Sequence, residues 1–241
     1  MYLILLIIIL IAIATYYHKL KNKYSWNSMK REFGELYGSV KCYDLNTHDE
    51  EQNFKYDELK MKYKEVFENE IGTPKMIKIE EDDCDKNDMK IIDYCRPLSH
   101  GYRTFKGLTI RIQTTPWKYS THFDSYDQVI QVLYGQKIWL LFDLHNKFKT
   151  TKDELNFIKQ ICGKDIFEIE SILKHKKGIN CEIKVTKAGQ SIYIPKGVYH
   201  VTQSSPNEGC IFMNIVTSHT DELLFHKFRE LWPNWSRGIQ K

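Results

Sequence analysis

Apolar residues downstream of residue 90 gather in short segments, and glycine or proline lies between most of them. The segments fall at residues 91–94, 108–113, 128–134, 137–142, 181–185, 191–194 and 210–216. Most of them are rich in β-branched and aromatic residues, which favour strands. Several short strands separated by turn residues are typical of a sandwich or barrel. The pattern therefore predicts a mainly β architecture for this part of the chain.

Helical spacing of apolar residues appears in three other places. Residues 47–71 place them on one face, and Thr47 with Glu50 has the spacing of a capping box. Residues 150–176 predict a helical insert between strands. Residues 221–232 predict a last helix that Thr220 caps and Pro233 ends. Its apolar stripe can pack on the barrel or pair with a second subunit, so we also expect a homodimer through this helix.

The N-terminus is an apolar run over residues 2–14, followed by two tyrosines and then by lysines. Including the tyrosines, its length is near the short end of what spans a bilayer, and lysines mark a cytoplasmic flank. We therefore expect a transmembrane anchor over residues 1–17 and a single-pass membrane protein with a cytosolic catalytic domain. A cleaved signal peptide is the alternative, because Ala12-Ile13-Ala14 has the small-x-small form of a cleavage site. Residues 18–90 are expected to form a linker and a helical N-terminal region.

Composition narrows the class of protein. Hydrophobic residues make up 42% of the chain and aromatic residues 13%, which excludes a disordered protein. The net charge of +4, from 35 basic and 31 acidic residues, is too balanced to indicate a nucleic-acid partner by itself. The six cysteines show no C-x-x-C spacing, so free thiols are expected and a zinc ribbon is not.

The candidate chemistry lies in the segment T-H-F-D and in a second segment, I-Y-I-P-K-G-V-Y-H, far downstream. His122 and Asp124 are two positions apart, so a strand would present both on one side. His200 ends the second segment and would supply another imidazole. Two histidines and one carboxylate on one face of a metal are typical of non-haem Fe(II) oxygenases. The alternative for His122 and Asp124 is a pair of ordinary surface residues, because H-x-D alone is a common pattern.

Lys137 opens the apolar segment at residues 137–142, just after Gly135. A lysine is costly to bury unless an anion meets it, so Lys137 is a candidate for binding the acid group of a co-substrate. The alternative is an outward-facing lysine on an edge strand. Arg111, Trp117 and Tyr119 could face a substrate near the same site, although an outward arginine and turn packing explain them equally well.

These residues together resemble the jumonji-C (JmjC) family, in particular its cupin-like hydroxylase branch. The first half of the resemblance is H-F-D, then an apolar strand, then G-Q-K and a strand ending in L-F. The second half is G-Q-S-I-Y-I-P-K-G-V-Y-H, over residues 189–200, and the two halves occur in the family's order. The resemblance covers about residues 91–217. The chain departs from the family before His122, where the turn is longer, and after Phe142, where Asp143-Leu144 replaces the usual Pro-Pro.

The resemblance implies a double-stranded β-helix, of the jelly-roll or cupin type, over residues 91–241, with Fe(II) as metal and 2-oxoglutarate as co-substrate. By position, His122, Asp124 and His200 match the iron ligands, and Lys137 matches the lysine that pairs with the distal carboxylate of 2-oxoglutarate.

Two further positions of the resemblance lie near the co-substrate. Asn214 matches a strand asparagine of the hydroxylase branch, and Tyr119 lies where the family often has threonine or serine. The spacing from His122 to Lys137 also resembles the hydroxylase branch.

The resemblance implies a dioxygenase that hydroxylates a protein or another macromolecule. A demethylase of methyl-lysine and a cupin-type binding protein without turnover are the alternatives.

Overall fold

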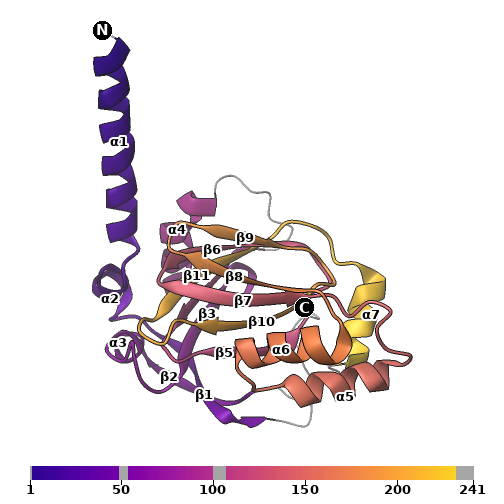
Figure 1. Ribbon diagram of the computed structural model, residues 1–241. Helices are drawn as coiled ribbons and strands as arrows, with labels where there is room; N and C mark the ends of the chain where they lie inside the picture. Colours follow the sequence, from indigo (N-terminus) through magenta and orange to yellow (C-terminus); the bar gives the residue numbers. More distant parts are fainter. Residues whose placement is uncertain (1, 49–53, 100–106, 232–241) are drawn as a thin grey trace.

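The computed structural model describes residues 2–48, 54–99 and 107–231 (Figure 1). This part of the chain is mainly β, with two antiparallel sheets and seven α-helices. The larger sheet has seven strands in the order β2-β1-β3-β4-β11-β6-β9, and the smaller has four in the order β5-β10-β7-β8. The strands are β1 (Tyr37–His48), β2 (Phe54–Lys62), β3 (Lys75–Glu80), β4 (Thr109–Gln113), β5 (Lys118–His122), β6 (Gln128–Tyr134), β7 (Gln136–Phe142), β8 (Cys181–Lys187), β9 (Ser191–Ile194), β10 (Tyr199–Ser204) and β11 (Cys210–Val216).

From β4 onward the chain passes from one sheet to the other after each strand, except that β7 and β8 follow each other in the smaller sheet. β4, β6, β9 and β11 lie in the larger sheet, and β5, β7, β8 and β10 lie in the smaller one. Two facing antiparallel sheets with this alternation form a cupin-like jelly roll. The mainly β architecture predicted from the apolar segments is therefore confirmed.

The central strands were predictable because both of their faces are covered. Every residue of β11 is buried, and β6 is buried except at its last residue. β6 turns into β7 at Gly135, whose φ is 72°. A Cβ there would lie 2.1 Å from the carbonyl oxygen of Gly209, so this turn requires glycine.

Three apolar cores follow from this layering. The interior between the two sheets is filled by side chains such as Val132, Trp139 and Phe212. The outer face of the larger sheet packs against α2 (Trp26–Phe33), α3 (Lys64–Phe67) and α4 (Lys86–Cys95). The outer face of the smaller sheet packs against α5 (Thr151–Ile161) and α6 (Ile166–Lys177) (Figure 1). A polar or charged side chain directed between the sheets is therefore shielded from water by both.

The expectation of a linker and a helical region over residues 18–90 is wrong for most of its length. β1, β2 and β3 extend the larger sheet from the edge of β4. The helix predicted over residues 47–71 is instead the end of β1, the strand β2 and the short helix α3, and Glu50 lies outside the described residues. β2 pairs with β1 along its length, and this pairing prevails over the helix-favouring Glu and Lys residues of its sequence.

Four other predictions can be compared with the structure. The strand predicted over residues 91–94 is wrong, because Ile91 and Ile92 lie on α4 and pack against the larger sheet. The helical insert is confirmed as α5 and α6, and the last helix as α7 (Glu222–Leu231).

The cap of α7 is Asp221 rather than the predicted Thr220. The side chain of Asp221 accepts a hydrogen bond from the Leu224 backbone N–H. All six cysteines are free thiols.

The apolar stripe of α7 takes part in packing. Leu231 is buried in the core outside the smaller sheet, and Leu224 packs against the same core. A homodimer through α7 stays a prediction.

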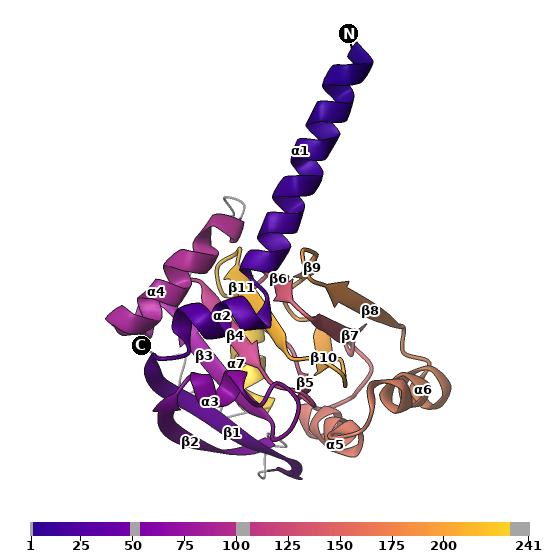
Figure 2. The ribbon, with the colours of Figure 1, turned by 90° about the vertical axis from the view of Figure 1, so that its left-hand side faces the viewer.

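The N-terminal helix α1 (Tyr2–Lys23) extends away from the sheets as a single rod (Figures 1 and 2). No helix in the described ranges is long and apolar enough to cross a membrane. The expectation of a transmembrane anchor over residues 1–17, and with it that of a single-pass membrane protein, is therefore wrong. The physical reason is length: polar residues from His18 onward fill the last part of α1, and its apolar part falls short of the roughly 20 residues that a bilayer requires.

Candidate metal centre

Two neighbouring strands of the smaller sheet bring the two histidines together. β5 ends at His122, and β10 carries His200 directly opposite it in the antiparallel register. The two imidazole centroids are 4.3 Å apart. Asp124 follows β5, and its Oδ2 lies 3.6 Å from Nε2 of His200. One ligand atom from each of the three residues lies within 4.8 Å of the others, so this His-Asp-His group could bind a metal ion.

A β-bulge gives β5 two inward side chains that a regular strand would place on opposite faces. Thr202 pairs with Tyr119 and His200 pairs with His122, so one more residue lies between the partners on β5 than on β10. Tyr119 and His122 are three positions apart, and strict alternation would send them in opposite directions. The extra residue of the bulge turns both side chains to the same face of the sheet. Bulges often have this effect beside functional sites.

Asp124 reaches the site from beyond the end of the strand, which differs from the expectation of two ligands on one strand. The side chain of Phe123, between His122 and Asp124, is buried in the core outside the smaller sheet. The carbonyl oxygen of Asp124 accepts a hydrogen bond from the backbone N–H of Gly197, 2.8 Å away, in the turn between β9 and β10. The turn that leads to His200 thus also fixes the backbone that carries the carboxylate.

Both imidazoles are oriented by hydrogen bonds on the side away from the carboxylate. Nδ1 of His122 lies 2.7 Å from the carbonyl oxygen of Ser120, and Nδ1 of His200 lies 3.2 Å from that of Val198. A carbonyl only accepts, so each Nδ1 carries the proton and donates it. Each Nε2 is then the unprotonated ring nitrogen, which is the form that binds a metal.

The carboxylate of Asp124 has its own partners, which sequence reasoning missed. The side-chain amide of Gln128 donates to Oδ2 of Asp124, and the Gln128 carbonyl oxygen accepts from Nδ2 of Asn214, 3.1 Å away. Tyr126 also hydrogen-bonds to Asp124, and the charge of that carboxylate raises the pKa of the phenol. The signal was available in the sequence: a glutamine at the start of the apolar segment Q-V-I-Q-V-L-Y needs a polar partner when it is buried.

Burial holds both histidines in the neutral state. Burial, reinforced by the neighbouring His200, lowers the pKa of His122 to about 4, although Asp124 acts in the opposite direction. Burial also lowers the pKa of His200. Neutral imidazoles need lose no proton to bind a metal at neutral pH.

Lys137 lies inside the barrel, on β7, with 1% of its surface exposed. Its Nζ is 3.3 Å from Oε1 of Gln113 and 3.8 Å from the centroid of the Phe212 ring. Burial lowers the pKa of Lys137 to about 7. Within the described residues, no carboxylate lies within ion-pair distance of this ammonium. The alternative of an outward-facing edge lysine is therefore wrong.

The other sequence candidates occupy the same interior. Asn214 is buried on β11 and reaches Asp124 through Gln128. Tyr119 lies between the cations of Arg111, 5.6 Å from its ring, and Lys137, 5.4 Å from its ring. Tyr119 donates its hydroxyl to the sulfur of Met76.

Several buried polar atoms of this interior have no hydrogen-bond partner. They are Nε of Arg111, Nε1 of Trp139, Oγ1 of Thr202 and Oδ1 of Asn214. Buried polar atoms are normally satisfied, so this set can accommodate a small polar ligand.

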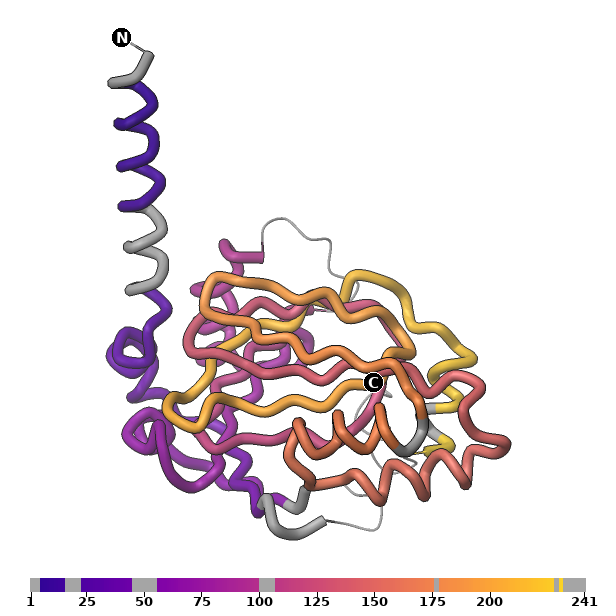
Figure 3. Tube along the Cα trace, viewed as in Figure 1, coloured from indigo at the N-terminus to yellow at the C-terminus, as the bar shows by residue number. Residues whose placement is uncertain are grey.

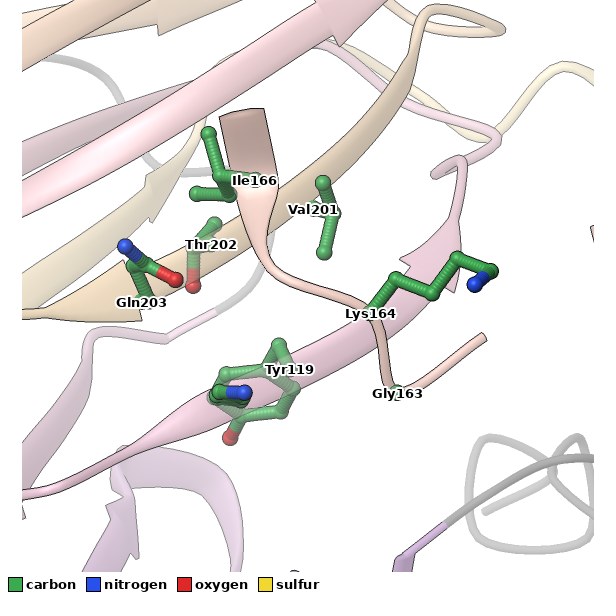
Figure 4. Close-up of a pocket in the computed structure, with 8 residues that line it drawn as sticks. Tyr119, Gly163, Lys164, Ile166, Val201, Thr202 and Gln203 are labelled. Atoms are coloured by element: carbon green, nitrogen blue, oxygen red, sulfur yellow. The ribbon is translucent and has the colours of Figure 1, made fainter. Parts of the chain in front are cut away.

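Two cavities lie elsewhere on the molecule. One, lined by Tyr119, Lys164 and Thr202 among others, holds about 10 Å³, which is enough for no more than one water molecule (Figure 4). The other is an open hollow of about 510 Å³ beside β8 and β9, lined by residues such as Val185 and Ile192. Neither is lined by His122, Asp124 or His200.

The residues fit a divalent transition metal. Two neutral imidazole nitrogens and one carboxylate oxygen within 4.8 Å of one another are ligands that such ions accept. The hydrogen bonds to Nδ1 of each histidine and to Asp124 are the outer partners that metal ligands normally have. The alternative of two surface polar residues at 122 and 124 does not agree with this convergence.

Comparison with known proteins gives no family. No protein-family profile matches the sequence, and no curated protein matches it. Among solved structures, the chain is similar to the Drosophila melanogaster CENP-C cupin domain, with a TM-score of 0.30 and 12% identity over 45% of this chain and 59% of that chain. A second structure, Drosophila melanogaster CENP-C bound to CAL1, has a TM-score of 0.29 at the same identity and coverage. The resemblance to the JmjC family therefore rests on the sequence motifs quoted above.

Proposed function

We propose that this protein is an Fe(II)- and 2-oxoglutarate-dependent dioxygenase that hydroxylates a protein or another macromolecule. The single observation that carries the proposal is the burial of Lys137 without a carboxylate partner in the same interior as the His-Asp-His group. An uncompensated buried ammonium is expensive, and a bound anion would remove that cost. The sequence motifs of the JmjC family point to the same anion.

The metal would be held by Nε2 of His122, Nε2 of His200 and a carboxylate oxygen of Asp124. When bound, Fe(II) with 2-oxoglutarate would supply O₂ activation and the oxidation of a substrate C–H bond. Ser120 and Val198 hold the two rings through their carbonyl oxygens. Gln128 donates to Oδ2 of Asp124, the oxygen that lies 3.6 Å from Nε2 of His200, and so orients the carboxylate.

Lys137 would pair with the distal carboxylate of 2-oxoglutarate. A carboxylate beside Nζ favours the ammonium, so binding would raise the pKa of Lys137 from about 7 and draw a proton from solvent. A charge-assisted hydrogen bond of this kind contributes about 1.5–3 kcal/mol. Asn214 and Tyr119 line the same interior and would contact the bound co-substrate.

A metal-binding cupin without turnover is the second candidate. The observation that favours it is the packing around Lys137: the Phe212 ring lies 3.8 Å from Nζ, where the distal carboxylate of 2-oxoglutarate would have to bind. For the dioxygenase, Phe212 or a neighbouring side chain must shift when 2-oxoglutarate binds.

Turnover of 2-oxoglutarate separates the two candidates. Purified full-length chain, with Fe(II), 2-oxoglutarate and O₂, should form succinate, and the Asp124→Ala variant should not. Lys137→Met should raise the KM for 2-oxoglutarate by roughly 10–100-fold, because the variant loses the free energy that the charge-assisted hydrogen bond contributes to binding. Lys187→Met is the matched control, because Lys187 is exposed on β8. Metal binding without succinate above the Asp124→Ala background would favour the binding protein.

A further inference from the structure

A continuous row of aromatic rings leads from the triad to the protein surface. The rings of Tyr119 and His122 are 6.2 Å apart, those of Trp117 and Tyr119 are 5.7 Å apart, and those of Tyr43 and Trp117 are 4.4 Å apart. Tyr56, 5.0 Å from Tyr43, ends the row with 47% of its surface exposed. Figure 2 shows that the β1–β2 hairpin, which supplies the two outer tyrosines, lies beside β5, which carries Tyr119 and His122 and begins directly after Trp117.

We propose that this row is an electron-transfer path that carries oxidising equivalents from the metal site to Tyr56, where a soluble reductant removes them. The inference rests on the proposed function only in requiring a redox-active iron at the triad. Tyrosine and tryptophan are the side chains whose one-electron oxidation is easiest among aromatic residues, and contact between successive rings allows an electron to move stepwise. Aromatic packing alone would stabilise the hairpin but would not require an oxidisable residue at each step.

Trp117 has the properties of a relay rather than of an end point. It is 1% exposed, and its indole Nε1–H has no hydrogen-bond acceptor. An oxidised indole that finds no acceptor cannot pass on its proton, so it keeps its positive charge and remains a strong oxidant. It therefore takes an electron from Tyr43, the ring in closest contact with it.

The charges near the inner end favour outward movement of the positive charge. The ammonium of Lys137 and the guanidinium of Arg111 both lie within 6 Å of the Tyr119 ring. Like charges repel strongly in a buried site, so an oxidised Tyr119 is disfavoured relative to rings further out. Lys41 lies 4.5 Å from the centroid of Tyr56, but Tyr56 is half exposed and water screens that charge.

With iron bound and oxidised by O₂ or a peroxide, Tyr119 would give it one electron, and one electron would move inward at every further step of the row. Tyr56 finally loses one electron to Tyr43 and one proton to water, which leaves a neutral phenoxyl radical. A soluble thiol then gives one hydrogen atom, that is one electron and one proton, which restores the phenol and leaves a thiyl radical. Two such thiyl radicals combine to a disulfide.

The test maps oxidation without relying on 2-oxoglutarate turnover. Full-length protein loaded with Fe(II) is treated with hydrogen peroxide and a spin trap, without thiol, and the trapped residues are identified by mass spectrometry. Protein loaded with Zn(II), which has no redox chemistry, is the control for oxidants that diffuse freely. Tyr37 and Tyr193 are matched internal controls, because they are 57% and 54% exposed and lie outside the row.

We expect trapping at Tyr56 well above that at Tyr37 and Tyr193 with Fe(II), and no such excess with Zn(II). Trp117→Phe and, separately, Tyr43→Phe should abolish the excess at Tyr56. Oxidation should then shift to Tyr119 in the first variant and to Trp117 and Tyr119 in the second. The Tyr43 variant retains its ring, so it keeps the proposal testable if the tryptophan variant folds poorly. Equal trapping on the three exposed tyrosines, or an excess at Tyr56 that survives both substitutions, would overturn the path. An excess at Tyr56 in a protein that forms no succinate would uphold the path and overturn the dioxygenase.

Discussion

Nε2 of His200 lies 3.6 Å from Oδ2 of Asp124, although the strands β6 to β9 and two helices separate the two residues along the chain. The antiparallel pairing of β5 with β10 brings the two segments together, and the Gly197 backbone N–H holds the carbonyl oxygen of Asp124. The His-Asp-His group is thus a product of the jelly-roll connection itself. A distortion of the β9–β10 turn would move the histidine and the carboxylate together.

Gln128→Leu should weaken metal binding without preventing folding. Gln128 donates to the Asp124 carboxylate and accepts from Asn214, so its loss frees the carboxylate to rotate. Loss of such an outer partner typically costs about 10–100-fold in metal affinity. Competitive titration of Co(II) measures the affinity, with Gln160→Leu on the exposed face of α5 as control. An unchanged Co(II) affinity would show that Gln128 does not position the ligand.

Lys137→Met should change how the stability of the metal-free protein depends on pH. The pKa of Lys137 is about 7 in the folded protein and near 10.5 when unfolded, so the unfolded chain binds one more proton between these values. The free energy of unfolding should therefore rise with pH across this window. Below about pH 7 Lys137 is charged in the folded protein as well, so the folded state carries the full cost of burying the ammonium.

The variant lacks the titrating group, so this part of its pH dependence should disappear. Each pKa unit corresponds to about 1.4 kcal/mol, which makes the difference a few kcal/mol across the window. Urea unfolding at several pH values measures it, and Lys187→Met should behave like the native protein. Parallel pH profiles for native protein and Lys137→Met would contradict the burial of a lowered-pKa lysine.

Metal affinity should resist mild acid. An unperturbed histidine begins to protonate near its ordinary pKa of 6.5, whereas burial lowers that of His122 to about 4. The affinity for Mn(II) should therefore stay nearly constant from about pH 7 to about pH 5 and fall only as His122 protonates. Mn(II) electron paramagnetic resonance follows the bound fraction. A steep loss of affinity already around pH 6.5 would mean that the imidazoles are not buried as described.

The strands that are buried on both faces were readable from the sequence, and those that carry the ligands were not. β6 and β11 are almost continuous apolar segments, and segments of this kind are stable only when they are buried in the interior of the protein. β5 reads K-Y-S-T-H, a polar segment whose strand character comes from its pairing with β10. β2 was misread as a helix because its charged residues favour helices, whereas its pairing with β1 decides the outcome.

The three side chains that converge were predictable from the sequence, but the residues that support them were not. The spacing of His122 and Asp124, and the distant His200, were identified from motifs. The bulge in β5 that turns Tyr119 inward has no signature in the sequence. The role of Gln128 depends on Asn214 across the interface of β6 and β11, a contact that only the register defines.

The most direct test of the central claim is the stoichiometry of Fe(II) bound by the purified full-length chain under anaerobic conditions, measured by metal analysis after gel filtration. The triad predicts one Fe(II) per chain, retained in His175→Ala, whose histidine is exposed on α6, and lost in each of His122→Ala, Asp124→Ala and His200→Ala. Circular dichroism of the metal-free variants separates loss of metal from loss of fold. Iron retained at native stoichiometry by folded variants of all three residues would contradict the account.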